Sequence, residues 1–241
     1  MYPLLIAAAA AMPHTALDRV LQEHVNATGE VDYEAIQQQD ALNAYLTSLA
    51  DVAEPSDPDA QLAFWINAYN AATIDLIADH YPLQSIRELD GGNPWDARRF
   101  VIAKKRHTLN QIQHRELKPI ADPRFHAAIS CASKGCPPLR QQAYTAESID
   151  QQLDTATRVW LTNGGALIDR ESQTVQISRI FEWYPDDFPN TSDIPGISGP
   201  QEAAINFIAQ FLPEHADWLL AGGYDVSFQR YDWSLNDQTD L

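Results

Sequence analysis

The stretch "AQLAFWINAYNAATIDLIADHY", residues 60–81, is apolar on nearly every side when it is drawn as a helix. Asp57 before Pro58 is typical of a helix N-cap followed by a first turn, and Pro82 ends the pattern. A helix that is apolar all round is buried among other elements rather than lying at the surface. We therefore predict a central buried helix around which the rest of the fold packs.

Shorter elements are predicted on both sides of this helix. Apolar residues at three- and four-residue spacing predict further helices, and Thr108 with Gln111 forms a capping-box signature at the start of one of them. These helices are expected over residues 15–27, 33–49, 108–117, 145–161 and 201–212, with a shorter one to 220. Strands are expected over residues 100–103, 124–130, 166–170, 174–178 and 224–233. Helices with few, non-consecutive strands predict an α+β fold, predominantly helical with a small mixed or antiparallel sheet, in a single domain over residues 13–241.

The charge of the chain is strongly negative and unevenly distributed. A formal net charge of -17 disfavours nonspecific binding to nucleic acid or to an anionic membrane. Between Arg98 and Arg140, however, ten Lys and Arg residues face only Glu116 and Asp122. This basic segment either attracts a small anionic molecule or peptide, or supplies ion-pair partners for carboxylates elsewhere in the chain.

Both cysteines of the chain lie inside this basic segment, in "HAAISCASKGCPPLR", residues 126–140. Cys131 follows a predicted strand, which is a common place for a functional side chain, and nearby cations lower the pKa of a thiol. A Cys131 nucleophile could take His114 as its base. Alternation along a strand would place His126 on the opposite face from Cys131, which favours a ligand-facing or core role for His126. Both histidines remain candidates for proton transfer.

Four further side chains are candidates for binding a ligand. Asn67 and Asn70 lie one turn apart on the buried helix, and a buried amide needs hydrogen-bond partners. These partners are either neighbouring loop carbonyls or a ligand. Arg140 and Lys134 are candidates for holding an anionic group. We expect the two asparagines, the two histidines and Arg140 to converge on one pocket near Cys131.

The two cysteines also permit a disulfide. A Cys131–Cys136 bond would close a short ring, and this reading gains weight if the protein is exported. The pattern of His126, Cys131 and Cys136 lacks the two short-spaced ligand pairs typical of zinc sites, so no metal is expected. No Gly-rich phosphate loop is present, and no cofactor is expected.

The beginning of the chain resembles part of an export signal. Residues 3–12, "PLLIAAAAAM", are apolar but shorter than the roughly 20 residues that a membrane-spanning helix needs. We interpret residues 1–12 as the remnant of an export signal, which favours a periplasmic or exported protein over a cytoplasmic one. No integral membrane segment is expected.

Five blocks of the sequence, taken together, resemble the family catalogued as domain of unknown function 547. The resemblance extends over about residues 30–190, and some relatives carry a glutaredoxin domain beside this one. It implies recurrent polar positions at Asn67, Asn70, His114, His126, Cys131, Cys136 and Arg140, but no established activity. The family pattern has Glu before the helix histidine, where this chain has Gln113. The blocks are "VDYEAI" (31–36), "AFWINAYNAATI" (63–74), "HTLNQIQHRELKP" (107–119), "DPRFHAAISCASKGCPPLR" (122–140) and "ISRIFEWYPDDF" (177–188).

Three functions are consistent with these observations. The first is a cysteine-dependent hydrolase or transferase that acts on a small anionic or peptide substrate. The second is a noncatalytic binding domain for an anionic or glutathione-like ligand. The third is thiol–disulfide exchange, or a structural disulfide, at Cys131 and Cys136. A histidine nitrogen close to the Cys131 sulfur would favour catalysis, whereas a bonded sulfur pair would favour the third function.

Overall fold

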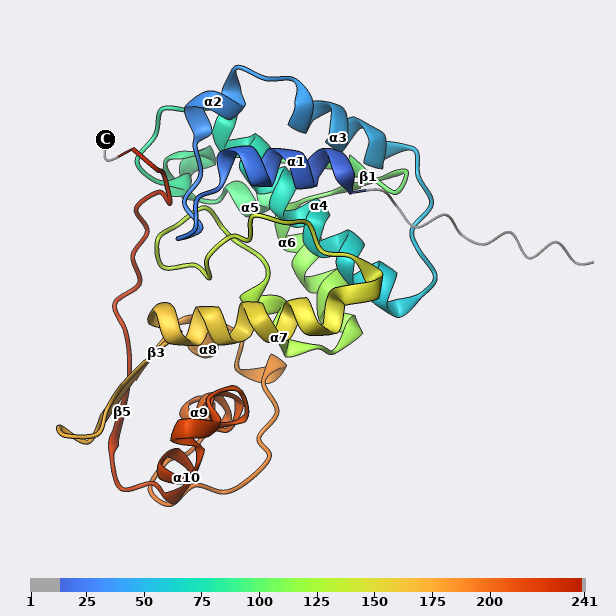
Figure 1. The fold of residues 1–241 in the computed structure, drawn as a ribbon. Helices are drawn as coiled ribbons and strands as arrows, with labels where there is room; N and C mark the ends of the chain where they lie inside the picture. The colour runs from blue at the N-terminus through green and yellow to red at the C-terminus, as the bar shows by residue number, and fades with distance from the viewer. Residues whose placement is uncertain (1–13, 240–241) are drawn as a thin grey trace, which may run out of the picture.

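Helix α4 (Pro58–Ala78) is buried along nearly its whole length at the centre of a group of helices, as predicted (Figure 1). The computed structural model describes residues 14–239, so the predicted export-signal remnant lies outside the described residues. The side chain of Asp57 caps α4 by accepting a hydrogen bond from the Ala60 N–H at 3.0 Å. Within residues 14–239, no helix combines the length and apolar character needed to cross a membrane.

Three helices precede α4 in the chain: α1 (Thr15–His24), α2 (Tyr33–Gln37) and α3 (Ala41–Ala50). The prediction of one continuous helix over residues 33–49 was wrong. The exposed polar run "QQQD", residues 37–40, interrupts the apolar face, and the chain turns there before α3 begins. Apolar side chains of all three helices join the same core as α4.

The chain then forms a short hairpin and an irregular helix that lead toward the cysteines. Strands β1 (Phe100–Ile102) and β2 (Lys105–His107) pair antiparallel, and the predicted capping box of Thr108 and Gln111 is present. It begins α6 (Leu109–Gln111), which continues as the π-helical segment η3 (Ile112–Leu117). The short elements before and after are η1 (Ile86–Glu88), η2 (Asp90–Gly92), α5 (Pro94–Ala97) and η4 (Lys118–Ile120).

The predicted strand over residues 124–130 is not formed. Residues Pro123–Ala127 form a 3-10 helix, η5, which Asp122 caps by accepting a hydrogen bond from the Arg124 N–H at 3.0 Å. Proline in the first turn fixes the backbone angle that a helical turn needs, and this local effect outweighs the strand-like apolar pattern. The alternation argument for His126 therefore fails, and the chain bends so that His126 and Cys131 reach the same cavity.

The remaining elements build a second apolar cluster beside a three-stranded sheet. Strands β3 (Ala166–Asp169) and β4 (Thr174–Ile177) form the predicted hairpin, and β5 (Asp225–Phe228) adds in parallel to β4, so the sheet is mixed. The α+β, predominantly helical fold class is confirmed. The helical elements of this part are η6 (Ala146–Ser148), α7 (Ile149–Trp160), η7 (Leu161–Gly165), α8 (Ile180–Trp183), η8 (Pro185–Asp187), α9 (Pro200–Phe211) and α10 (Pro213–Ala221).

Helix α7 lies between the two clusters (Figure 1) and contributes to both of them. Ile149 and Leu153 pack into the cluster around α4, whereas Ala156 and Trp160 pack into the cluster around α9. One amphipathic helix thus connects the two groups of apolar side chains.

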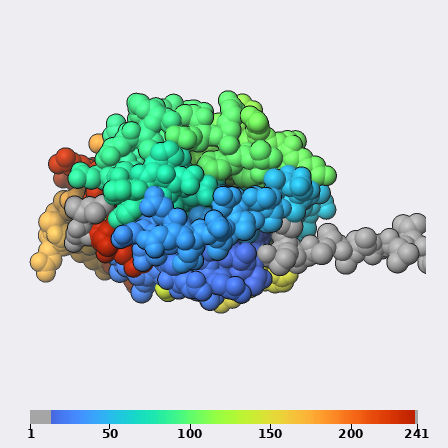
Figure 2. Space-filling model, turned by 90° about the horizontal axis from the view of Figure 1, so that it is seen from above, coloured from blue at the N-terminus to red at the C-terminus, as the bar shows by residue number. Residues whose placement is uncertain are grey.

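The end of the described chain returns to the first helices, so that red and blue segments meet in Figure 2. The Val31 N–H donates to the Asn236 carbonyl at 2.9 Å, and the Gln238 N–H donates to the Val31 carbonyl at 3.1 Å. The Tyr33 hydroxyl also donates to the Asn236 side chain at 2.7 Å. Residues 236–238 are therefore fixed against the segment around Val31 and the start of α2.

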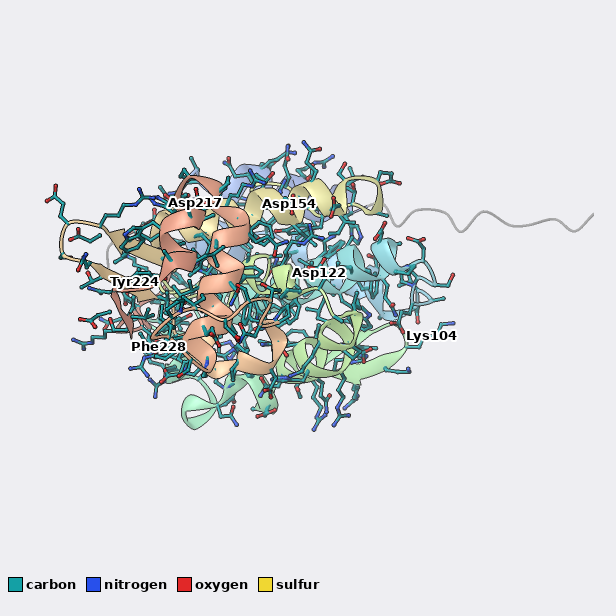
Figure 3. All side chains as sticks on the ribbon, turned by 90° about the horizontal axis from the view of Figure 1, so that it is seen from below. Lys104, Asp122, Asp154, Asp217, Tyr224 and Phe228 are labelled. Carbon is teal, nitrogen blue, oxygen red and sulfur yellow. A yellow bond between two sulfur atoms is a disulfide. The ribbon has the colours of Figure 1, made fainter. Side chains whose placement is uncertain are left out.

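Several cations of the basic segment are paired with carboxylates. Arg124 contacts Asp122, Asp150 and Asp154 at 2.6–2.8 Å, and Figure 3 labels Asp122 and Asp154 on neighbouring segments. Lys118 contacts Asp187 at 2.6 Å. Internal pairing, one of the two alternatives predicted for this segment, therefore accounts for part of its charge.

Replacing Asp75 of α4 with Asn is expected to stabilise the fold at neutral pH. Burial and the charge of Asp79 raise the pKa of Asp75 to about 6, so ionising this carboxyl costs stability. We expect the free energy of unfolding of Asp75→Asn to exceed that of the wild type by about 1 kcal/mol at pH 7.5, after allowance for solvent screening. Because the wild-type carboxyl becomes protonated as the pH falls from 7 to 4, the difference should disappear over that range. Urea unfolding across this range measures it.

The matched control is Asp59→Asn, in the first turn of the same helix. A carboxylate at this end interacts favourably with the helix dipole, so its loss should lower stability by a few tenths of a kcal/mol. Equal effects of the two substitutions at pH 7.5 would contradict the burial argument for Asp75.

Candidate functional site

A cavity of about 250 Å³ lies between the two clusters, and aromatic side chains form most of its wall. The segments that supply its lining range from α4 to the residues after β5. Among the described residues, no Asp, Glu, Lys or Arg lines it. The lining residues are Tyr69, Trp95, Asn110, Gln113, His126, Ile129, Cys131, Cys136, Ile180, Trp183, Tyr184, Tyr231 and Trp233.

Four of the aromatic rings support one another at one side of the cavity. The ring centroids of Trp183 and Tyr231 are 4.7 Å apart, those of Tyr231 and Trp233 4.5 Å, and those of Trp95 and Trp233 5.8 Å. Trp183 also stacks on Trp233 at 5.6 Å. Trp183 is nevertheless 39% exposed, so part of this aromatic surface faces solvent. The rings form a preorganised surface on which another ring can stack.

Cys131 and Cys136 form a disulfide in the wall of the cavity, with their Cα atoms 6.3 Å apart. The Cys131 N–H donates to the Cys136 Sγ at 3.0 Å. The Tyr231 hydroxyl lies 3.1 Å from the Cys136 Sγ and 3.3 Å from the Cys131 Sγ. Of the alternatives left open by the sequence, the structure contains the bonded sulfur pair.

His126 also lines the cavity, is buried and bonds to a carboxylate. Its Nε2 lies 2.9 Å from Oδ2 of Asp187, and its ring stacks on Tyr184 with centroids 4.8 Å apart. Burial lowers the pKa of His126 although Asp187 acts to raise it, so the imidazole is neutral at pH 7. The pairs with His126 and Lys118 outweigh burial at Asp187 and lower the pKa of its carboxyl.

Gln113, rather than His114, reaches the cavity from the π-helical segment. Gln113 is buried and forms a side-chain hydrogen bond to Tyr184, whereas His114 is exposed. The ring of His114 lies 5.9 Å from that of Tyr184, and His114 does not line the cavity. Asn110 lines the cavity from α6. Two amide side chains, which both donate and accept hydrogen bonds, are thus available to a ligand.

Asn67 and Asn70 both bond to backbone groups. The Asn70 amide donates to the Ala128 carbonyl at 2.8 Å and accepts from the Ser130 N–H at 2.9 Å. Asn67 makes the same pair of bonds to Tyr144, at 2.8 and 2.9 Å. The first alternative predicted for these residues is the one observed. Asn70 thus holds the backbone of residues 128 and 130, next to Cys131, whereas Asn67 holds Tyr144, which does not line the cavity.

Arg140 and Lys134 lie outside the cavity lining. Arg140 donates to the Gln152 carbonyl at 3.0 Å, and its guanidinium lies 5.2 Å from the ring centroid of Tyr144. Lys134 is exposed on the loop between the cysteines. The structure therefore brings His126 and the cysteines together but does not bring Arg140, His114 or the asparagines into the same cavity. An anion beside Arg140 stays a prediction.

The aromatic lining and Asp187 were missed from the sequence. The available signal was two aromatic-rich segments, "FEWYPDDF" (181–188) and "RYDW" (230–233), and the second was interpreted only as the end of a strand. Within residues 14–239, no group of three His, Cys, Asp or Glu side chains is arranged to hold a metal ion.

Residues 53–161 match the family model described as "Protein of unknown function, DUF547", in agreement with the resemblance inferred from the sequence. No curated protein and no solved structure matches the chain. The matched segment supplies the lining residues from Tyr69 to Cys136, whereas the lining residues from Ile180 to Trp233 lie outside it.

Proposed function

We propose that this protein binds a small uncharged molecule that has a planar ring and at least one hydrogen-bonding group. The observation that carries the proposal is the lining of the cavity, in which aromatic rings and two amides occur without a charged side chain in the described part of the chain. Ligand sites are typically apolar concave surfaces with a few placed polar groups. The volume of about 250 Å³ is below the roughly 300–1,000 Å³ of sites for drug-sized molecules, so the ligand is small.

The environment of the cavity also argues for a neutral ligand. A charged group enters an apolar site only if an opposite charge or several hydrogen bonds replace its water. Asp187 already bonds to His126 and Lys118, and His126 is neutral. Asn110, and the groups of the Gln113 amide that do not bond to Tyr184, remain to orient a carbonyl, hydroxyl or amide group of the ligand.

Binding is favoured over cysteine nucleophilic catalysis because the sulfur of Cys131 is bonded to that of Cys136. A thiolate, rather than a disulfide sulfur, is the nucleophile of cysteine hydrolases. His126 lines the same cavity as Cys131, and its Nε2 bonds to Asp187.

Uncharged ring probes should bind the oxidised protein more tightly than charged ones. The probes are indole, p-cresol and benzamide, compared with 4-hydroxybenzoate and tyramine, which add a charge of either sign. Nuclear magnetic resonance shifts of the tryptophan indole N–H groups report binding. Shifts at Trp95, Trp183 and Trp233 are expected, because these rings line the cavity.

Trp183→Ala should weaken probe binding by about tenfold, which is the effect of losing one aromatic stacking partner. The matched control is Trp218→Ala, because Trp218 stacks on Tyr224 in the second cluster and does not line the cavity. Equal affinities for charged and uncharged probes, or equal effects of the two substitutions, would reject the proposal.

A further inference from the structure

Both sulfur atoms of the disulfide belong to residues that line the cavity, and neither cysteine is fully buried. We propose that the Cys131–Cys136 disulfide exchanges with a small uncharged thiol that enters this cavity. The inference rests on the proposed function, because the thiol reaches the sulfur atoms through the same aromatic site. It adds a reaction to what would otherwise be a binding site.

Hydrogen-bond donors surround the sulfur atoms in a way that favours a thiolate over a disulfide. The Cys131 N–H and the Tyr231 hydroxyl lie 3.0 and 3.1 Å from the Cys136 Sγ. A disulfide sulfur accepts hydrogen bonds weakly, whereas a thiolate accepts them strongly. Burial raises the pKa of Tyr231 well above its ordinary value, so its hydroxyl keeps its proton as a donor. These contacts therefore stabilise the reduced state more than the oxidised state.

The donors are unequal on the two sulfur atoms, and this inequality gives the exchange a direction. The Cys136 Sγ accepts from the backbone N–H and lies 3.1 Å from the Tyr231 hydroxyl, whereas the Cys131 Sγ lies 3.3 Å from each of the hydroxyls of Ser133 and Tyr231. The Ser133 hydroxyl lies 2.9 Å from that of Tyr231, so Ser133 can donate to Tyr231 while Tyr231 directs its single proton to the nearer sulfur, that of Cys136. The better-stabilised thiolate is the better leaving group in thiol–disulfide exchange. The incoming thiol should therefore attack Cys131.

The reaction balances with two equivalents of the thiol. A first thiolate attacks the Cys131 Sγ, the bond between the cysteines breaks, and its electron pair moves to the Cys136 Sγ. A second thiolate then attacks the ligand sulfur of the mixed disulfide. This step releases the disulfide of the ligand and leaves both cysteines reduced. The protein gains two electrons, and two thiols are oxidised.

The loop between the cysteines is held in place without the disulfide. The Lys134 N–H donates to the Ser234 carbonyl at 2.8 Å, and the Gly135 N–H donates to the Asp232 carbonyl at 2.9 Å. The Asn236 N–H also donates to the Ala132 carbonyl at 3.2 Å. Reduction can therefore open the sulfur bond while the loop keeps its position.

Gly135 fixes Tyr231 beside the sulfur atoms. A Cβ atom at residue 135 would lie 2.9 Å from the Asp232 carbonyl oxygen and 3.0 Å from ring atoms of Tyr231. Only a residue without a side chain allows this approach. The absence of a side chain at Gly135 thus lets the ring of Tyr231 lie against the loop between the cysteines.

The test equilibrates the folded full-length protein with 2-mercaptoethanol and 2-hydroxyethyl disulfide, an uncharged pair, and measures the fraction reduced by intact mass after thiol alkylation. Tyr231→Phe should lower the equilibrium constant for reduction by about tenfold, as expected for losing one hydrogen bond to a charged acceptor. Tyr224→Phe is the matched control, because the Tyr224 hydroxyl bonds to the Leu219 carbonyl. In a second variant, Cys136→Ser, the Cys131 thiolate should attack 2-hydroxyethyl disulfide, release one 2-mercaptoethanol and keep a mixed disulfide that no protein thiol can resolve.

Rates test entry through the cavity. For each thiol, the rate of reaction with the folded protein is divided by its rate of reaction with a small model disulfide, which removes the difference in intrinsic reactivity. The resulting ratio should be at least tenfold larger for mercaptoethanol than for glutathione, because glutathione carries charges.

Reduction only under unfolding conditions, or equal equilibrium constants for Tyr231→Phe and Tyr224→Phe, would overturn the inference. Failed exchange with intact binding of thiol-free ring probes would reject this inference alone. Failed probe binding with intact exchange would reject the proposed function.

Discussion

Replacing Asn70 with Ala is expected to lower the free energy of unfolding by about 3 kcal/mol and to weaken binding of ring probes. The substitution leaves the Ala128 carbonyl and the Ser130 N–H without their partners in a buried site. Each unsatisfied buried group costs about 1–3 kcal/mol. Because Ser130 adjoins Cys131, the loss of these bonds should also displace the wall of the cavity. Chemical denaturation and the probe titration measure the two effects.

Asn67→Ala is the matched control for this prediction. Asn67 lies one turn from Asn70 on α4 and makes the same two bonds, but to Tyr144, which does not line the cavity. The two variants should lose similar stability, and only Asn70→Ala should lose probe affinity when both are compared at a temperature where they are folded. Unchanged probe affinity in Asn70→Ala would show that Asn70 has no positioning role at the site.

Asp187→Ala is expected to cost about 3 kcal/mol at pH 7, because it removes the buried partner of His126. The loss should grow as the pH falls. The pKa of His126 is lower in the folded state than in the unfolded chain, so the unfolded chain binds more protons as the pH falls through about 6.5. Asp187 acts to raise the pKa of His126, so this pKa is lower still in the folded Asp187→Ala variant. The free energy of unfolding of the variant therefore continues to fall at pH values where that of the wild type has levelled off. Denaturation at pH 7 and pH 5 tests this prediction.

Lys118→Ala serves as the control for Asp187→Ala. Lys118 contacts the same carboxylate but its side chain is 42% exposed, so its removal should cost less than about 1 kcal/mol. If the difference in free energy of unfolding between the wild type and Asp187→Ala became smaller from pH 7 to pH 5, Asp187 would not set the protonation of His126.

Local signals predicted the parts of the fold that local interactions form. The apolar run of α4 with its Asp57 cap, the capping box of Thr108, and the hairpin of β3 and β4 each depend on neighbouring residues. The same reasoning failed at residues 124–130, where a capping side chain and a proline give a helical turn to an apolar run that resembles a strand.

The cavity could be predicted only in part because its walls come from distant segments. The sequence placed His126 and Cys131 among the candidates, but it offered no relation between Cys136 and Tyr231, which lie 95 residues apart. Asn67 and Asn70 illustrate a second limit. Their burial followed from the helix, but only the structure shows that both serve backbone groups.

The contacts between the cysteine loop and residues 231–236 have a consequence for the order of events during synthesis. A ribosome adds about 5–20 residues per second, so Tyr231 emerges at least several seconds after Cys136. During this interval the cysteines lack the tyrosine hydroxyl and the backbone carbonyls of Asp232 and Ser234. The nascent chain therefore presents two accessible sulfur atoms that are not yet subject to the environment of the cavity. Oxidation in that interval would close the ring before Tyr231 arrives, and the tyrosine would then pack against a disulfide already formed.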